Sequence, residues 1–145
     1  HVGFVFQEFF LLSGLSAVEN VANGLLYSGI GITERLDRSK QMLERVGLGH
    51  RLTHKPSEMS GGEQQRVAVA RALVHEPSFV LADEPTGNLD SVSTDALMRL
   101  FYELNAEGTT IILITHDREV AEQFPRRVEL KDGRIEFDSA YGGAS

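Results

Sequence analysis

The sequence of 145 residues contains no cysteine. A chain without thiols can form neither a disulfide framework nor a thiolate metal site, which is compatible with a reducing cytoplasm. No apolar stretch approaches the roughly 20 residues needed to cross a bilayer, so we expect no transmembrane helix. At this length we expect a single globular domain that can bury one hydrophobic core.

An excess of basic residues is also lacking. The chain has 14 Lys and Arg against 21 Asp and Glu, and its formal net charge is -7 at pH 7. Proteins that bind the phosphate backbone of nucleic acids usually carry a basic face. We therefore expect no nucleic-acid partner.

The most informative stretch is an apolar run, residues 79–82, that stops at two adjacent carboxylates, Asp83 and Glu84. A run without polar alternation is typical of a strand covered on both faces of a parallel sheet, and ligands bind at the carboxyl edge of such sheets. Neighbouring side chains on an extended chain point in opposite directions, so we expect one acid to serve a metal and the other a water. For an isolated Asp-Glu pair, an acidic turn that caps a helix before Ser91 is the simpler explanation.

Two further runs typical of β-strands also end in polar residues. The run over residues 2–6 is followed by Gln7, and the run over residues 110–115 is followed by His116. Taken alone, Gln7 is compatible with a surface residue and His116 with a structural one. Together the runs predict an α/β fold in which Glu84 and His116 come from strand ends that could be neighbours.

A pair of glycines, Gly61 and Gly62, opens a predicted helix that continues to Val74. Glycine here lets a ligand approach the unpaired amides at the helix start, where the helix dipole favours anions. Ser60 and Glu63 also have the spacing of a capping box, with the glycines as a tight turn. The two interpretations are compatible with each other.

The remaining pattern sets the organisation of the chain. Residues 8–75 are predicted to be mostly helical and to form a subdomain inserted into a sheet, whose other parts are residues 1–7 and 76–145. In the subdomain we expect a helix from the capping box of Ser16 and Glu19 to about Tyr27, and a second helix that is capped by Thr33 and ended by Gly47. After it we expect a helix from Asp90 or Ser91 to Gly108 and a short helix over 118–123. A hairpin around Asp132-Gly133 and a loose tail over 141–145 are expected at the end.

Four motifs occur in this order along the sequence: Gln7, residues 60–66, residues 83–90, and Thr115-His116-Asp117. In this order the sequence resembles the ATP-binding-cassette (ABC) ATPases over nearly its whole length. Residues 17–21, 54–58 and 87–90 resemble most the lipoprotein-releasing and macrolide-export branch. The resemblance implies a P-loop NTPase (RecA-like) parallel sheet core, here incomplete, with an inserted α-helical subdomain.

The resemblance implies ATP and Mg²⁺ as cofactors and gives the strand-end residues their roles. Asp83 would hold Mg²⁺ through water, and Glu84 would polarise the attacking water. Gln7, in the glutamine loop, would touch the metal and the water and sense the membrane partner. His116 would contact the γ-phosphate.

The other motifs would act between two copies of the domain. Ser60, Gly61, Gly62 and Glu63 would form the signature that binds the γ-phosphate of ATP held by the opposite subunit, and Asp90 would lie in a loop that crosses the dimer interface. The sequence departs from the family at Met59, where Leu is commoner, and at Glu63, where Gln is commoner.

No Gly-x-x-x-x-Gly-Lys-Ser/Thr motif occurs in the sequence. Since the family places this phosphate loop before the glutamine loop, we expect the sequence to be an N-terminally truncated fragment that does not hydrolyse ATP alone. The complete protein would be a peripheral ATPase on the cytoplasmic side of the inner membrane, a homodimer that couples ATP hydrolysis to export or lipoprotein release through a permease. An ABC ATPase that controls cell division or cell-wall hydrolysis is the alternative, and a non-enzymatic binding module is a third possibility.

Overall fold

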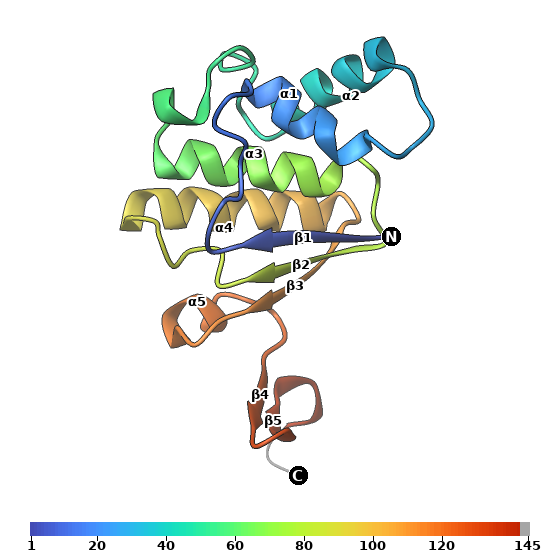
Figure 1. Cartoon of the computed structure of the whole chain (residues 1–145). Helices are drawn as coiled ribbons and strands as arrows, with labels where there is room; N and C mark the ends of the chain where they lie inside the picture. The colour runs from blue at the N-terminus through green and yellow to red at the C-terminus, as the bar shows by residue number, and fades with distance from the viewer. Residues whose placement is uncertain (143–145) are drawn as a thin grey trace. The chain divides into compact units, whose positions relative to one another are not determined.

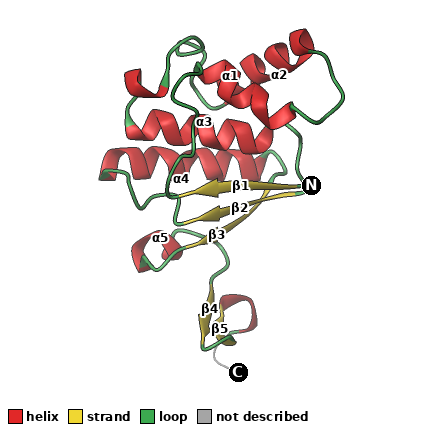
Figure 2. Ribbon diagram, viewed as in Figure 1, coloured by secondary structure: helices red, strands yellow, loops and turns green. Residues whose placement is uncertain are grey.

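A computed structural model describes residues 1–142, and the chain divides into two compact units at Ile114 and Thr115 (Figure 1). Both units mix helices and strands (Figure 2). The predicted division at residues 7 and 75 concerns finer parts of the first unit and stays a prediction.

The first unit is built on a parallel sheet with the strand order β1-β2-β3. The strands are β1 (Val2–Phe6), β2 (Phe79–Asp83) and β3 (Thr110–Ile114). Their register places Phe6 opposite Asp83, and Asp83 opposite Ile114. All three strands therefore end at the same level, and the α/β fold predicted from the sequence is confirmed.

Helices of the first unit form layers above one face of this sheet. They are α1 (Ala17–Ala22) with a 3₁₀ turn (Asn23–Leu25), α2 (Ile32–Arg45), a 3₁₀ turn (Pro56–Glu58), α3 (Gly61–Leu73) and α4 (Ser91–Ala106). In Figure 1, α3 and α4 lie next to the sheet, and α1 and α2 lie beyond α3. At Gly3 an added Cβ would lie 2.6 Å from the Ala72 carbonyl oxygen, so α3 packs on β1 at a distance that only glycine allows.

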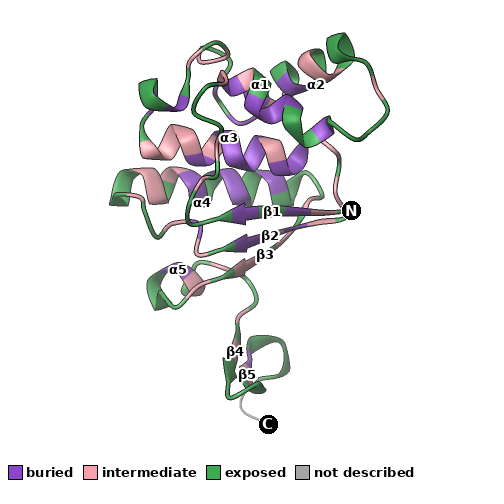
Figure 3. Cartoon of the chain, in the orientation of Figure 1, coloured by how far each residue is buried: buried purple, intermediate pink, exposed green. Residues whose placement is uncertain are grey.

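The opposite face of the sheet is open in the first unit. Val80 and Ala82 of β2 are buried, whereas Phe4 of β1 and Ile112 of β3 are each 47% exposed. Figure 3 shows the buried residues gathered on the helices and within the strands of this sheet. In β2, Phe79 and Leu81 on this face are only partly buried, so the expected full cover on both faces of that strand is not met within the first unit, whose helices pack on one face.

Helix ends agree with the capping signals in part. Ser16 and Glu19 form the predicted capping box at the start of α1. The second helix begins at Ile32 after Gly31, which provides no side-chain cap, so the predicted cap at Thr33 is wrong. The reason is that Thr33 already lies inside the first turn.

The second unit contains a short helix and a hairpin. The helix is α5 (Arg118–Glu122), and the hairpin joins β4 (Val128–Lys131) to β5 (Arg134–Asp138), followed by a 3₁₀ turn (Ser139–Tyr141). Asp132 and Gly133 have φ values of 49° and 75°, which fit the tight turn predicted between the strands. The predicted loose tail lies mostly outside the described residues, over 143–145.

Arg126 fixes the end of this hairpin. Its guanidinium donates to both carboxylate oxygens of Asp138, at 3.1 and 2.7 Å. These hydrogen bonds, together with one from the Ala140 amide, hold the pKa of Asp138 below its usual range.

Among residues 1–142, none of the helices in either unit combines the length and the apolarity that crossing a membrane requires.

Candidate functional site

The carboxyl ends of β1 and β2 place predicted residues at neighbouring positions. Phe6 pairs with Asp83 in the register, so Gln7 follows β1 at the level where Glu84 follows β2. Asp83 is exposed at the end of its strand. This edge of the sheet therefore carries one amide and two carboxylates, all oxygen-bearing groups.

Glu84 has a backbone conformation that the sequence does not reveal. Its φ is 47°, in the left-handed region that side-chain-bearing residues seldom adopt. Its N–H donates to the Ile114 carbonyl at 2.8 Å, and its carbonyl accepts from Gly87 at 3.1 Å. The extended backbone expected at Asp83 and Glu84 thus ends at Glu84, because the chain turns at this residue. Such strain costs about 1–3 kcal/mol and is often found at functional sites.

The loop after β2 is joined to the end of β1 by side-chain amides. Asn88 donates from Nδ2 to the Gln7 carbonyl at 3.1 Å, and Gln7 donates from Nε2 to Asn88 Oδ1 at 3.3 Å. Between them lies Gly87, where an added Cβ would lie 2.5 Å from Gln7 Cδ. Only glycine at this position allows the Gln7 side chain to rest against the loop.

Behind this loop, a fully buried amide of α3 connects the same two segments. Gln65 donates from Nε2 to the Phe6 carbonyl at 2.9 Å and to the Pro85 carbonyl at 2.6 Å. Its relative exposure is 0%. The helix that begins at Gly61 thus holds both strand ends through one side chain.

The start of α3 has the predicted capping box. Ser60 Oγ accepts from the Glu63 N–H at 3.1 Å, and Glu63 Oε1 accepts from the Ser60 N–H at 3.1 Å. An added Cβ at Gly62 would lie 2.7 Å from Ser93 Oγ. Gly62 is therefore required by the close approach of α4, a reason that differs from ligand access.

Glu63 takes part in a charged cluster beside this helix start. Arg51 donates from Nε to Glu63 Oε2 at 2.8 Å, and the same guanidinium lies 3.1 Å from His54 Nε2. Burial opposes ionisation of Glu63, but the Ser60 N–H and the charge of Arg51 outweigh it and hold the pKa of Glu63 below its usual range. Glu63 is consequently a carboxylate at neutral pH.

Replacing Arg51 by glutamine is expected to raise the pKa of Glu63 toward its ordinary value, about 4.3. Because the folded pKa is the lower one, the stability from this pair is present above the unfolded pKa and is lost as the pH falls through the folded pKa. Titration of the Glu63 carboxyl carbon by NMR measures the shift. Arg38→Gln, which removes the exposed pair with Glu34, is the control that leaves this titration unchanged. An unchanged pKa in Arg51→Gln would contradict the assignment of its cause.

Asp90 uses its carboxylate to cap α4. Its Oδ1 accepts from the Ser93 N–H at 2.7 Å, and this bond holds the pKa of Asp90 below its usual range. The cap predicted for Asp90 or Ser91 is thus made by Asp90. Since Ser93 is also the neighbour of Gly62, the capped end of α4 lies against the start of α3.

His116 belongs to the second unit, two residues beyond the end of β3. Asp117, the next residue, caps α5 by accepting from the Glu119 N–H at 2.9 Å. The predicted approach of His116 to Glu84 stays a prediction.

Comparison with known proteins identifies the architecture. A family described as ABC transporter matches residues 1–87, which is more than half of the chain. The chain belongs to the ABC transporter family. This confirms the resemblance and the P-loop NTPase fold class.

Relatives within the ABC family are close in sequence. An uncharacterized ABC transporter ATP-binding protein of Bacillus subtilis, YknY, is 54% identical over 92% of this chain and 58% of its own length. The macrolide export ATP-binding/permease protein MacB of Hyphomonas neptunium is 52% identical over 94% of this chain and 21% of its own length. The chain thus spans little more than half of the first relative.

Solved ABC cassettes have the same fold. A dimeric, post-hydrolysis state of the cassette MJ0796 bound to ADP and Pi superposes with a TM-score of 0.78 at 42% identity, covering 94% of this chain and 61% of that chain. The cassette cbiO1 of Clostridium perfringens superposes with a TM-score of 0.85 at 32% identity, covering 94% of this chain and 56% of that chain.

The oxygen groups at the sheet edge fit the metal that accompanies nucleotides in ABC ATPases. Magnesium prefers oxygen ligands and is usually held by one or two carboxylates, waters and phosphates. Asp83 and the amide oxygen of Gln7 are donors of this kind. Within residues 1–142 no group of three or more His, Cys, Asp or Glu side chains could hold a metal.

Sequence reasoning missed three residues that connect the motifs. Gln65 lies three and four positions before the buried Ala68 and Val69, so helical periodicity could have placed it in the core. Arg71 donates to the Phe9 and Phe10 carbonyls at 2.9 and 2.7 Å, which no sequence pattern indicates. The pairing of Asn88 with Gln7 depends on the turn after β2 and likewise has no signal in the sequence.

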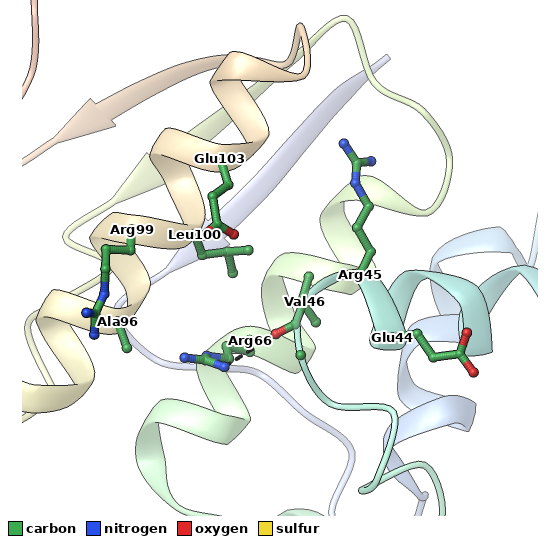
Figure 4. A pocket seen from close by; sticks show the side chains of 9 residues that line it. Glu44, Arg45, Val46, Arg66, Ala96, Arg99, Leu100 and Glu103 are labelled. Carbon is green, nitrogen blue, oxygen red and sulfur yellow. Dashed lines mark hydrogen bonds between the residues drawn. The ribbon is translucent and has the colours of Figure 1, made fainter.

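A cavity of about 350 Å³ lies elsewhere in the first unit, where the end of α2 approaches α3 and α4. Arg66 and Arg99 line it from facing helices, together with Glu44 and Glu103 (Figure 4). None of the predicted site residues lines this cavity. Its mixed charges give no preference for a ligand of either sign.

Proposed function

We propose that this chain is part of the ATP-binding subunit of an ABC transporter, in which ATP binding and hydrolysis drive export of a substrate through a membrane permease. The observation that carries the proposal is the aligned ending of β1 and β2 in Gln7, Asp83 and Glu84, in a chain of the ABC family. The names of relatives such as MacB, a macrolide export protein, support transport as the task.

Hydrolysis requires a water in line with the γ-phosphate and neutralisation of charge on the phosphate oxygens. Mg²⁺, when bound, supplies that neutralisation. Asp83, through a water, and the amide oxygen of Gln7 would hold it, and the Glu84 carboxylate would accept a hydrogen bond from the attacking water and take its proton. The backbone of Glu84 is tied to Ile114, so its side chain starts from a fixed point at the strand end.

His116 contributes from the second unit by contacting the γ-phosphate. An imidazole N–H donates to a phosphate oxygen and so stabilises the charge that develops there.

The start of α3 serves the ATP bound by a second copy of the domain. The capping box occupies the N–H groups of Ser60 and Glu63 and leaves those of Gly61 and Gly62 to meet an anion. Asp90, which caps α4, lies at the start of that helix, and the start of α4 packs against the start of α3. These residues form the face that two copies bring together around nucleotide.

The remaining partners follow from this function. A membrane permease receives the motion of the dimer, and the complete protein works as a peripheral subunit on the cytoplasmic side of the membrane. The loop after Gln7, in which Arg71 of α3 donates to the Phe9 and Phe10 carbonyls, is the segment that we place between the nucleotide face and the permease.

Replacing Ser60 by arginine tests this proposal in the complete protein. A bulky cation at the centre of the dimer face is expected to weaken ATP-driven dimerisation at least about tenfold, since a loss of about 1.4 kcal/mol already has this effect. Analytical ultracentrifugation with ATP, in a Glu84→Gln background that slows hydrolysis, measures the dimer. Ser57→Arg, at an exposed position before α3, is the matched control. Undiminished dimerisation of the Ser60 variant would refute the proposal.

A further inference from the structure

We propose that Asn88 is a positioning residue that sets the orientation of the Gln7 side-chain amide and so presents the oxygen of Gln7 to a cation or a water. The proposal rests on the proposed function, which gives Gln7 its task. No motif in the sequence assigns this role to Asn88.

The orientation follows from which atoms can donate. The Gln7 carbonyl can only accept, so the Asn88 amide must turn its Nδ2 toward it, at 3.1 Å. Asn88 Oδ1 then faces the Gln7 side chain and can also only accept. Gln7 must therefore present Nε2 to Asn88, at 3.3 Å, and its Oε1 is the atom left over. One backbone carbonyl thus determines two amide orientations in succession.

The surrounding packing keeps the two amides in register. Gly87 lies directly beneath the Gln7 amide, with the position of an added Cβ only 2.6 Å from Gln7 Nε2. Gln65 fixes the backbone near both partners by donating to the carbonyls of Phe6, next to Gln7, and of Pro85, three residues before Asn88. Segments that are 81 residues apart in sequence are therefore held as one piece where Gln7 meets Asn88.

A reversed Gln7 amide would be unsuitable for the site. Its Oε1 would face Asn88 Oδ1, two acceptors without a proton between them, and its NH₂ group would face the cation. Magnesium takes oxygen ligands, so only the observed orientation serves it. Without Asn88 both orientations of the Gln7 amide become accessible. The apparent affinity for the metal then falls in proportion to the fraction of molecules whose Gln7 oxygen faces the cation.

The first test observes Gln7 without any nucleotide. In ¹⁵N NMR spectra of the complete protein, the Gln7 side-chain NH₂ signals are assigned by their absence in Gln7→Ala. Asn88→Ala is expected to shift these signals and to speed their hydrogen exchange. Asn105→Ala removes a comparable amide bond, Nδ2 to the Thr109 carbonyl at 3.0 Å, and is expected to leave them in place. Unmoved Gln7 signals in Asn88→Ala would overturn the proposal.

The second test measures the Mg²⁺ concentration for half-maximal ATP hydrolysis. Asn88→Ala is expected to raise it about two- to fivefold, because the competent fraction of Gln7 falls. In a Gln7→Ala background the same change is expected to add nothing, as required of a residue that acts through Gln7. An equal rise in both backgrounds would overturn the positioning role.

These tests separate the failure of the inference from that of the proposed function. A complete protein that hydrolyses no ATP would refute the function, while the NMR signals of Gln7 would still decide whether Asn88 orients it. Thermal unfolding of Asn88→Ala and Asn105→Ala, expected to coincide, excludes a general loss of folding as the cause of either result.

Discussion

Replacing Glu84 by glutamine is expected to slow ATP hydrolysis by the complete protein about 10²- to 10⁴-fold, the contribution of a positioned general base. Glutamine keeps the size of the side chain but cannot take a proton from water. ATP affinity is expected to change little, because Asp83 and Gln7 remain to hold the metal. The steady-state rate at saturating ATP and the dissociation constant of ATP measure the two effects separately.

A control for this substitution is present at the other end of the same strand. Glu76 precedes β2 and also has a positive φ, 53°, but lies away from the carboxyl edge of the sheet. Glu76→Gln therefore makes the same chemical change on a similar backbone and is expected to hydrolyse ATP at the parental rate. Should Glu84→Gln do so as well, Glu84 is not the base.

Local signals predicted much of the fold. The capping boxes at Ser16 and Ser60, the Asp132-Gly133 turn and the β-rich runs each depend on residues within a few positions of one another. In such segments the side chain and the backbone group that it satisfies are close in sequence. The agreement of the capping boxes and the turn with the structure indicates that these elements are locally determined.

The connections within the site were not predictable for the opposite reason. Glu84 turns into the left-handed region because its N–H bonds to Ile114, on a strand formed 30 residues later. Gly62 was predicted to let a ligand approach the helix start, and no pattern in the sequence indicated the second reason for a small residue there, which is Ser93 on another helix. Likewise the open face of the sheet at Phe4 depends on which segments pack there, which the apolar composition of the strands does not specify.

Gln65 is where these long-range connections meet, and its replacement by leucine is expected to lower the free energy of unfolding by about 2–4 kcal/mol. Leucine fills a similar volume but removes the donor shared by the Phe6 and Pro85 carbonyls. Each buried acceptor left unpaired costs about 1–3 kcal/mol, and here there are two. The burial of the apolar leucine side chain offsets part of their summed cost. Urea unfolding measures the change as a lower midpoint at an unchanged slope.

The neighbouring Gln64 shows why position rather than chemistry decides this effect. Its Nε2 donates to a single carbonyl, that of Met59, at 3.2 Å, and its side chain is only partly buried. Water can take the place of Gln64, so Gln64→Leu is expected to cost less than about 1 kcal/mol. Equal losses for the two variants would mean that the carbonyls of Phe6 and Pro85 find other donors, and that the two strand ends are not held together through Gln65.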